Sequence, residues 1–432
     1  NAGVGGTHAA HEYSLSVNHL QTQGFNDCQG QLTAGCFTIE PDEDGYDNTA
    51  LTAHWGYQIN EDINLKTQAF RAQGRTEYDS SFDNEADFVQ QVVHAQSDFV
   101  VNDDWFMLLN LGHHQDELTN FGHQVAETFF DTQRSSLAWQ NEYGLTATQL
   151  FTAGYDYQHE SIDSSTAYTV ASRDNHGIYL AYQGQWPQQT ELTLSVRHDD
   201  NEQFGHYTTG HLGVGYGLTE TIQAVAAYGN AFKAPTFNEL YFPALGDFPA
   251  FGNPQLQPEE STTFEIGLRS AQQTLNWSVS VYHTQIEQMI GSFPAENIDE
   301  AEIIGSEAQL TWQQPQWLLN TQLTWLDPED ERTGQLLPRR AQRTFALNLT
   351  RYWDKTQVTL NILAQSHRFE DSANLYRLGG YAVLNLWGDY QLTPRWRVQT
   401  RLDNLLDKDY QTARFYNTGG RQFWVTLHYQ GL

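Results

Sequence analysis

The sequence predicts an all-β fold, a transmembrane antiparallel β-barrel of about 21 strands. Three observations predict it. Apolar and polar residues alternate along the chain with a period of two, no run of residues is apolar enough for a membrane-spanning helix, and the connections between the predicted strands fall into a short and a long class.

The composition excludes several classes of protein. The chain has 432 residues, and 22 Lys and Arg stand against 53 Asp and Glu, which gives a formal net charge of −31. A nucleic-acid scaffold would need a basic stripe instead. Aromatic residues make up 13% of the chain and charged residues 17%, and this mixture is too aromatic for a disordered chain.

The predicted strands follow one another along the whole chain. Tyr13, Leu15 and Val17 alternate with Ser14 and Ser16, so that one face of this strand is apolar and the other is polar. The same pattern recurs in residues 151–158, 192–196, 222–228, 264–268, 319–325, 358–362, 396–402 and 423–429.

The connections separate a barrel from a soluble sandwich. Short ones, such as Asn60 to Asp62 and Thr393-Pro394, contrast with long ones, such as Asp27 to Asn48 and Pro235 to Pro258. Short turns on one rim and long loops on the other are typical of outer-membrane barrels, whereas a sandwich has strands at closer spacing. Because bacterial single-chain barrels have an even number of strands, about 21 strands suggest that one is missing from an end.

The two cysteines predict a loop disulfide. Cys28 and Cys36 are close in sequence and are flanked by turns that contain glycine. This arrangement favours one small disulfide in an extracellular or periplasm-facing loop over a zinc site, with two free thiols in a reducing cytosol as the alternative.

An enzyme is not expected. The 16 histidines are dispersed, and the chain contains no HExxH, GxSxG or P-loop motif. The glycines at 213, 215 and 217 lie inside an alternating strand and do not form a phosphate-binding loop.

Two long motifs resemble the TonB-dependent outer-membrane receptors and transporters, whose barrels have 22 strands. Residues 228–241, followed by 252–259 and Glu265, look like the mid-barrel signature of that family, and Asp403 to Tyr410 with Gly420 to Phe423 resembles its last hairpin. Both motifs also have a structural role, because their Asn, Asp and Pro residues suit rigid turns, and we expect this role and no contact with substrate.

Within the family the chain most resembles the vitamin B12 (cobalamin) transporter group. The similar segments are Arg197 to Gly205, Lys233 to Glu259 and Lys408 to Thr412. The resemblance implies active uptake of a scarce nutrient, most readily cobalamin, across the bacterial outer membrane. The alternatives are a ferric-siderophore or haem receptor, a passive porin and a secreted β-rich binding protein.

The resemblance also implies a calcium site, because acidic extracellular loops of the cobalamin group bind calcium and then help to hold the corrinoid. The predicted ligands are Asp27, Asp42, Asp44, Asp47 and Asp79. Calcium takes six to eight oxygen ligands, and carboxylates from several loops can supply them. An acidic chain also places many carboxylates in loops that are simply solvated.

The resemblance covers nearly all of the chain, and residues 1–432 are expected to form one transmembrane barrel domain. Two features depart from the family pattern. The N-terminal plug domain of the family and the first barrel strand are expected to be missing, so that the closing seam between the first segment and Phe423 to Tyr429 is open or imperfect. The chain ends in Tyr429-Gln430-Gly431-Leu432, although such barrels commonly end on an aromatic residue. The implied partners are a small-molecule corrinoid or siderophore, outer-membrane lipid and the TonB complex acting through the plug, and the protein is expected to be monomeric.

Overall fold

A computed structural model describes residues 1–122, 127–244, 250–291 and 295–431. Within them the regular secondary structure is almost entirely β-strand, with one short helix, α1, at Phe237–Tyr241. None of the helical structure in these residues has the length and apolar character that a membrane crossing requires.

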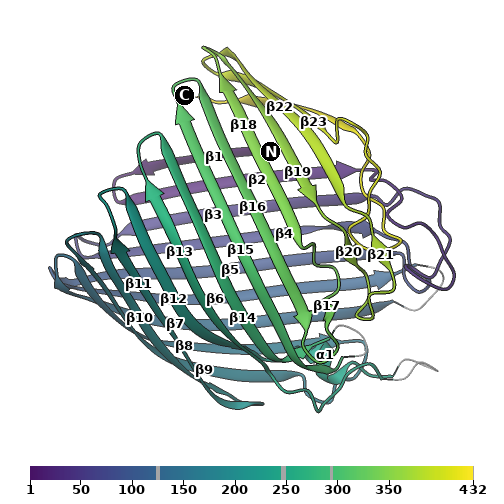
Figure 1. Cartoon of the computed structure of the whole chain (residues 1–432), viewed down its shortest axis with the longest axis horizontal. Helices are drawn as coiled ribbons and strands as arrows, with labels where there is room; N and C mark the ends of the chain where they lie inside the picture. The colour runs from purple at the N-terminus through teal and green to yellow at the C-terminus, as the bar shows by residue number, and fades with distance from the viewer. Residues whose placement is uncertain (123–126, 245–249, 292–294, 432) are drawn as a thin grey trace.

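The strands form one large sheet and a separate hairpin (Figure 1). Their bounds are β1 Ala2–His8, β2 His11–Thr22, β3 Tyr46–Gln58, β4 Ile63–Glu77, β5 Glu85–Asn102, β6 Trp105–Phe121, β7 Thr128–Thr146, β8 Gln149–Ser164, β9 Ser172–Trp186, β10 Thr190–Asn201, β11 Gly205–Gly217, β12 Ile222–Lys233, β13 Glu259–Ala271, β14 Leu275–Ile290, β15 Asn297–Gln314, β16 Trp317–Asp330, β17 Gln335–Leu336, β18 Arg343–Tyr352, β19 Thr356–Gln365, β20 Arg368–Phe369, β21 Arg377–Leu378, β22 Tyr381–Thr393, β23 Trp396–Asp403 and β24 Gln422–Tyr429.

The large sheet is an antiparallel meander. It contains 22 strands in the described residues, and one of them, β17, is a two-residue strand beside β16 at the rim. The remaining 21 strands agree with the predicted number, although β1, β23 and β24 are shorter than the ten residues expected. In Figure 1 the purple and blue strands of the N-terminal part cross behind the green strands β13 to β18, as the two walls of a barrel do.

The apolar face of the sheet points outward, as predicted. On β24, Phe423, Val425 and Leu427 alternate with Trp424, Thr426 and His428, and the side chains of Phe423, Val425 and Leu427 are each more than half exposed. The opposite face carries charged networks, such as Arg197 with Asp156 and Asp199. An apolar outer face around a polar interior is the pattern of a membrane barrel and excludes a soluble sandwich with an apolar core.

The two rims of the barrel differ in their connections. One rim carries turns of two to four residues, such as 59–62 and 394–395. The other carries longer connections, up to residues 234–258, although 202–204 is short. In outer-membrane barrels the short turns are periplasmic and the long loops extracellular, so the rim with the long loops is the extracellular rim of this barrel. The first long loop, residues 23–45, begins and ends a few residues earlier than the predicted Asp27 to Asn48, because β2 ends at Thr22 and β3 already begins at Tyr46.

The sheet has an open seam. The ladders pair β1 with β2 and β24 with β23, and in the described residues no ladder joins β1 to β24. All residues of β1 are exposed. The predicted imperfect seam is therefore confirmed, and two strand edges carry backbone groups without a ladder partner.

The mid-barrel motif packs as a structural element. Thr236 caps α1 through a capping box with Glu239, and Leu240 and Leu256 are buried with Ile290 in a small cluster. The Arg173 guanidinium donates to the Pro235 carbonyl at 2.7 Å. These contacts support the structural role expected for the motif, because they fix the return of a long loop.

Candidate functional site

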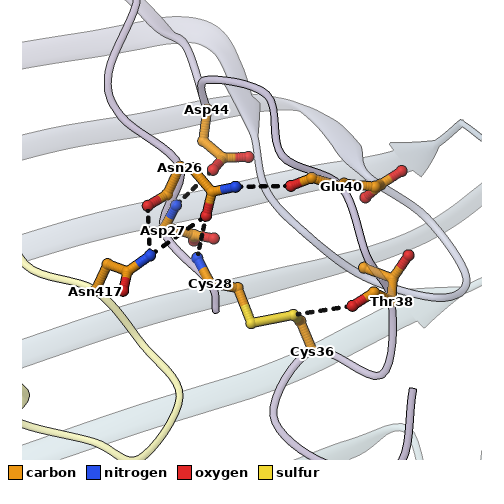
Figure 2. Close-up of a disulfide and its surroundings, with 8 residues drawn as sticks. All are labelled: Asn26, Asp27, Cys28, Cys36, Thr38, Glu40, Asp44 and Asn417. Carbon is orange, nitrogen blue, oxygen red and sulfur yellow. Dashed lines mark hydrogen bonds between the residues drawn. A yellow bond between two sulfur atoms is a disulfide. The ribbon is translucent and has the colours of Figure 1, made fainter. Parts of the chain in front are cut away.

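The loop between β2 and β3, residues 23–45, is closed on itself by a disulfide (Figure 2). Cys28 and Cys36 are bonded, with their Cα atoms 6.5 Å apart, and both are buried. The predicted disulfide is confirmed. It ties a glycine-containing segment that lacks regular secondary structure, so this covalent link restricts the loop where backbone hydrogen bonds are few.

The same loop is held by the last long loop of the barrel, residues 404–421. The Gln29 amide donates to the Phe415 carbonyl and the Asn417 amide to the Asp27 carbonyl, both at 2.7 Å. The Asn417 side chain donates to the Asn26 carbonyl at 3.0 Å (Figure 2). The two loops that flank the open seam are therefore joined at the extracellular rim.

Asn26 has a structural role in this loop. Its side-chain amide donates to the Glu40 carbonyl at 2.8 Å, and its side-chain oxygen accepts from the Cys28 amide at 3.1 Å. A carboxylate could accept the second bond but could not donate the first. An amide at this position is thus suited to fastening the loop, and the neighbouring Asp27 supplies the carboxylate.

Three carboxylates from two loops converge beside the disulfide. Asp27 and Asp44 lie in the 23–45 loop, and Asp79 follows β4. Each offers an oxygen atom within 4.8 Å of the other two. The Asp27 amide donates to Asp44 Oδ2 at 2.8 Å, which positions the Asp44 carboxylate over the start of the loop.

Burial leaves the charge of this cluster poorly compensated. Asp79 is only 7% exposed, and its Oδ2 atom, like Oδ1 of Asp27, is buried without a hydrogen-bond partner. Desolvation, and then the charges of Asp44 and Asp27, raise the pKa of Asp79 to about 7. Burial is also the largest cause that raises the pKa of Asp27 and of Asp44. Buried, unpartnered carboxylate oxygens facing one another form a donor set that suits a hard divalent cation.

The other predicted ligands lie outside this set of three. Asp42 is exposed, although its charge contributes to the raised pKa values of Asp44 and Asp79. Asp47 belongs to β3, where it lies 3.8 Å from the imidazole of His19. The structure therefore brings Asp27, Asp44 and Asp79 together, keeps Asp42 at the surface nearby and separates Asp47.

Two acidic residues near the cluster were not among the predicted ligands. Glu77 Oε2 accepts from the Gly45 amide at 2.9 Å, and its charge raises the pKa of Asp44. The charge of Glu40 raises the pKa of Asp79. Glu77 stands two residues before Asp79 at the end of a strand, which is the sequence feature that would have identified it.

Comparison with known proteins identifies the barrel. The family model described as "TonB dependent receptor-like, beta-barrel" matches residues 7–405. The chain is similar to the vitamin B12 transporter BtuB of Photobacterium profundum, with 29% identity over 417 residues, which cover 91% of this chain and 66% of that protein. It is also similar to the BtuB of Vibrio vulnificus, with 29% identity over 71% of this chain and 51% of that protein.

Among solved structures, the barrel resembles the ferric enterobactin receptor PfeA of Pseudomonas aeruginosa. The TM-score is 0.84 with 16% identity, over 99% of this chain and 76% of that one. At this identity the likeness establishes the fold. The chain spans from about half to about two thirds of the length of the curated relatives it matches. The match over residues 7–405, together with the barrel geometry, shows that the chain belongs to the TonB-dependent receptor-like β-barrel family of outer-membrane proteins.

Proposed function

We propose that this barrel belongs to a TonB-dependent transporter that takes up cobalamin across the outer membrane. The observation that carries the proposal is the similarity, over 91% of the chain, to a protein named as a vitamin B12 transporter. In this proposal the barrel wall and the long loops hold the corrinoid. The TonB complex supplies energy through a plug of the kind that the family carries.

Calcium is the proposed cofactor of the extracellular loops. Asp27, Asp44 and Asp79 would hold the ion, and the fit rests on the two buried carboxylate oxygens that lack a partner. Bound calcium supplies positive charge that offsets the repulsion among the carboxylates. Asp42, at the surface nearby, would add to the negative potential that attracts the ion.

The position of the cluster supports a role in substrate binding. The 23–45 loop that carries Asp27 and Asp44 contacts the 404–421 loop at the extracellular rim, where substrate arrives. If calcium orders these loops before the corrinoid binds, calcium binding offsets the free-energy cost of ordering them. The apparent affinity for the corrinoid then rises. The disulfide limits how far the loop can unfold without the ion.

A ferric-siderophore receptor is the second candidate, because the barrel also resembles the receptor PfeA. The charge of this chain favours cobalamin. A net charge of −31 and an acidic cluster at the rim repel an anionic ferric siderophore, whereas a corrinoid without net charge meets no such barrier.

Uptake measurements test this function. Cells that lack their own cobalamin transporter, and that produce this protein in outer membranes, should accumulate labelled cobalamin only when TonB is present. A parallel uptake measurement on the same cells uses a labelled ferric siderophore. Cobalamin uptake that depends on TonB supports the proposal, and siderophore uptake without any cobalamin uptake would replace it with the second candidate.

A further inference from the structure

An arginine on the outer face of the barrel lies between two tryptophans. Arg351 on β18 stands directly across from Trp317 on β16 in the ladder register. The Arg351 guanidinium carbon is 4.7 Å from the centroid of the Trp317 ring and 5.5 Å from that of Trp353. Both distances are within the range in which aromatic faces attract a cation.

The register places these side chains on the lipid-facing side. Along β18, Arg351 alternates with polar Thr350 and Tyr352 and shares its face with Leu349, which pairs with Leu360 of β19. The β18–β19 turn, where the Trp353 amide donates to the Thr356 carbonyl, is one of the short turns. Because the short turns are periplasmic, Arg351 stands at the level of the periplasmic-leaflet headgroups.

Arg351 also borders a hollow in the outer surface. The hollow has a volume of about 410 Å³ and is lined by Trp317, Leu349, Arg351, Trp353, Val358 and Leu360. Apart from the guanidinium and the indole nitrogens, the lining side chains are hydrocarbon. A single positive group at the end of an apolar hollow is complementary to an amphiphile that has an anionic head and an acyl chain.

Among the residues that the structure describes, the guanidinium has no acidic partner. In the part of the chain that the structure describes, no carboxylate or carbonyl accepts a hydrogen bond from Arg351. Nine other arginines of this acidic chain pair with carboxylates: Arg75, Arg134, Arg173, Arg197, Arg269, Arg339, Arg397, Arg401 and Arg421. Arg351 thus keeps its donors available on the membrane side, where lipid phosphates are the acceptors.

The charge of this part of the rim favours an anionic ligand. The short turns, all within the described residues, contain two basic residues, Lys355 and Arg395, and these lie in the turns after β18 and β22. Both are exposed. Asp354 is the single acid in these two turns, whereas the turns at 59–62 and 103–104 are acidic. The positive potential of the periplasmic rim is therefore concentrated near Arg351.

We propose that Arg351, Trp317 and Trp353 form a binding site for a glycerophospholipid of the periplasmic leaflet. The guanidinium donates to the phosphodiester of the headgroup, a geometry for which its planar fork is suited. The two indole rings hold the guanidinium in place, and one acyl chain lies in the hollow over Leu349 and Leu360.

Native mass spectrometry of the protein purified from outer membranes in mild detergent tests the site. With added phosphatidylglycerol, the wild-type protein should retain one tightly bound lipid. Arg351→Ala should weaken that retention about tenfold, since it removes a charge-assisted contact to phosphate. Arg351→Lys should give an intermediate loss, because it keeps the charge but not the planar fork.

Arg343→Ala is the matched control. Arg343 is exposed on the same strand and the same face, and pairs across from Trp325, but it stands at the extracellular end of β18. This variant should retain the lipid as the wild type does. Heat-modifiable electrophoretic mobility checks that each variant is folded, and Trp353→Leu gives a second variant that leaves the charge intact.

Two further binding measurements identify the chemistry of the ligand. Diacylglycerol, which has the acyl chains but no phosphate, should not be retained, and inorganic phosphate should not displace the phospholipid. Equal retention by wild type, Arg351→Ala and Arg343→Ala would overturn the proposal. The proposal would also be overturned if diacylglycerol were retained as well as phosphatidylglycerol, or if inorganic phosphate displaced the bound phospholipid. A protein dimer that forms without bound lipid would overturn it as well.

Discussion

The backbone amide of Asn417 donates a hydrogen bond to the carbonyl oxygen of Asp27 at 2.7 Å, joining the last long loop of the barrel to the first. Asp27 is also one of the three carboxylates that converge beside the disulfide. The candidate calcium site is therefore fastened to a loop from the other end of the chain. Anything that orders Asp27 is expected to order the 404–421 loop as well.

Asn417→Ala tests this link between the loops. The variant removes the two side-chain hydrogen bonds to Asn26, which together contribute about 1–2 kcal/mol to local stability. Hydrogen exchange should accelerate in residues 23–45 and 404–421 and should stay unchanged in the strands. Asn374→Ala is the control, because its side chain donates to the Leu336 carbonyl in a different loop pair. Acceleration confined to residues 404–421 would show that the loops are not coupled.

Removal of the disulfide by Cys28→Ser with Cys36→Ser should loosen the 23–45 loop and leave the barrel folded. A loop this short gives a chain-entropy contribution of about 2–3 kcal/mol, which acts on the loop. Limited proteolysis should then cut within residues 23–45, while heat-modifiable mobility stays that of the wild type. Loss of the folded barrel would contradict this expectation, because it would mean that the disulfide stabilises the sheet and not only the loop.

Calcium affinity should depend on pH through Asp79. The pKa of this carboxyl is raised from 3.8 to about 7, so the folded loop disfavours its charged form. The metal-free loop therefore loses stability as the pH rises from 3.8 towards 7, whereas calcium needs the ionised form. As the pH is lowered below 7, the calcium affinity should fall about tenfold per pH unit if calcium displaces one proton. Above pH 7 the affinity should level off. Calcium titrations from about pH 5 to about pH 8 measure this, and a flat profile would contradict it.

Single carboxylate substitutions should separate the converging residues from the others. Asp79→Asn and Asp44→Asn should each weaken calcium binding by about tenfold or more, because each removes a charged oxygen ligand. Asp47→Asn is the matched control on β3, where the carboxylate lies near His19, and it should have little effect. Isothermal titration calorimetry measures all three. If Asp47→Asn lost as much calcium affinity as the other two variants, the effect would come from the overall negative charge and not from a specific calcium site.

Much of the barrel was predictable from sequence because a strand repeats every two residues. Tyr13, Leu15 and Val17 could only share a face, and the same rule placed Phe423, Val425 and Leu427 on the lipid side. The disulfide followed from two cysteines eight residues apart.

The details of the site were less predictable, because they depend on contacts between distant segments. Asn26 fastens the loop through Asn417, at a separation of 391 residues, and no local pattern encodes that contact. Asp47 looked like a loop residue, but β3 begins at Tyr46, so the ladder to β2 and β4 takes it away from Asp44. The approach of Asp79 to Asp27 likewise depends on how the ends of β2, β3 and β4 are arranged at the rim.

The most direct test of the central claim is cobalamin binding to the protein in outer membranes, with calcium and with a chelator. Calcium should raise the affinity for cobalamin in the wild type and in Asp47→Asn. In Asp79→Asn the affinity should stay at the chelator value whether or not calcium is present. Equal cobalamin affinity with calcium and with chelator in the wild type would remove the role of calcium. Absence of cobalamin binding together with tight binding of a ferric siderophore would contradict the proposed substrate.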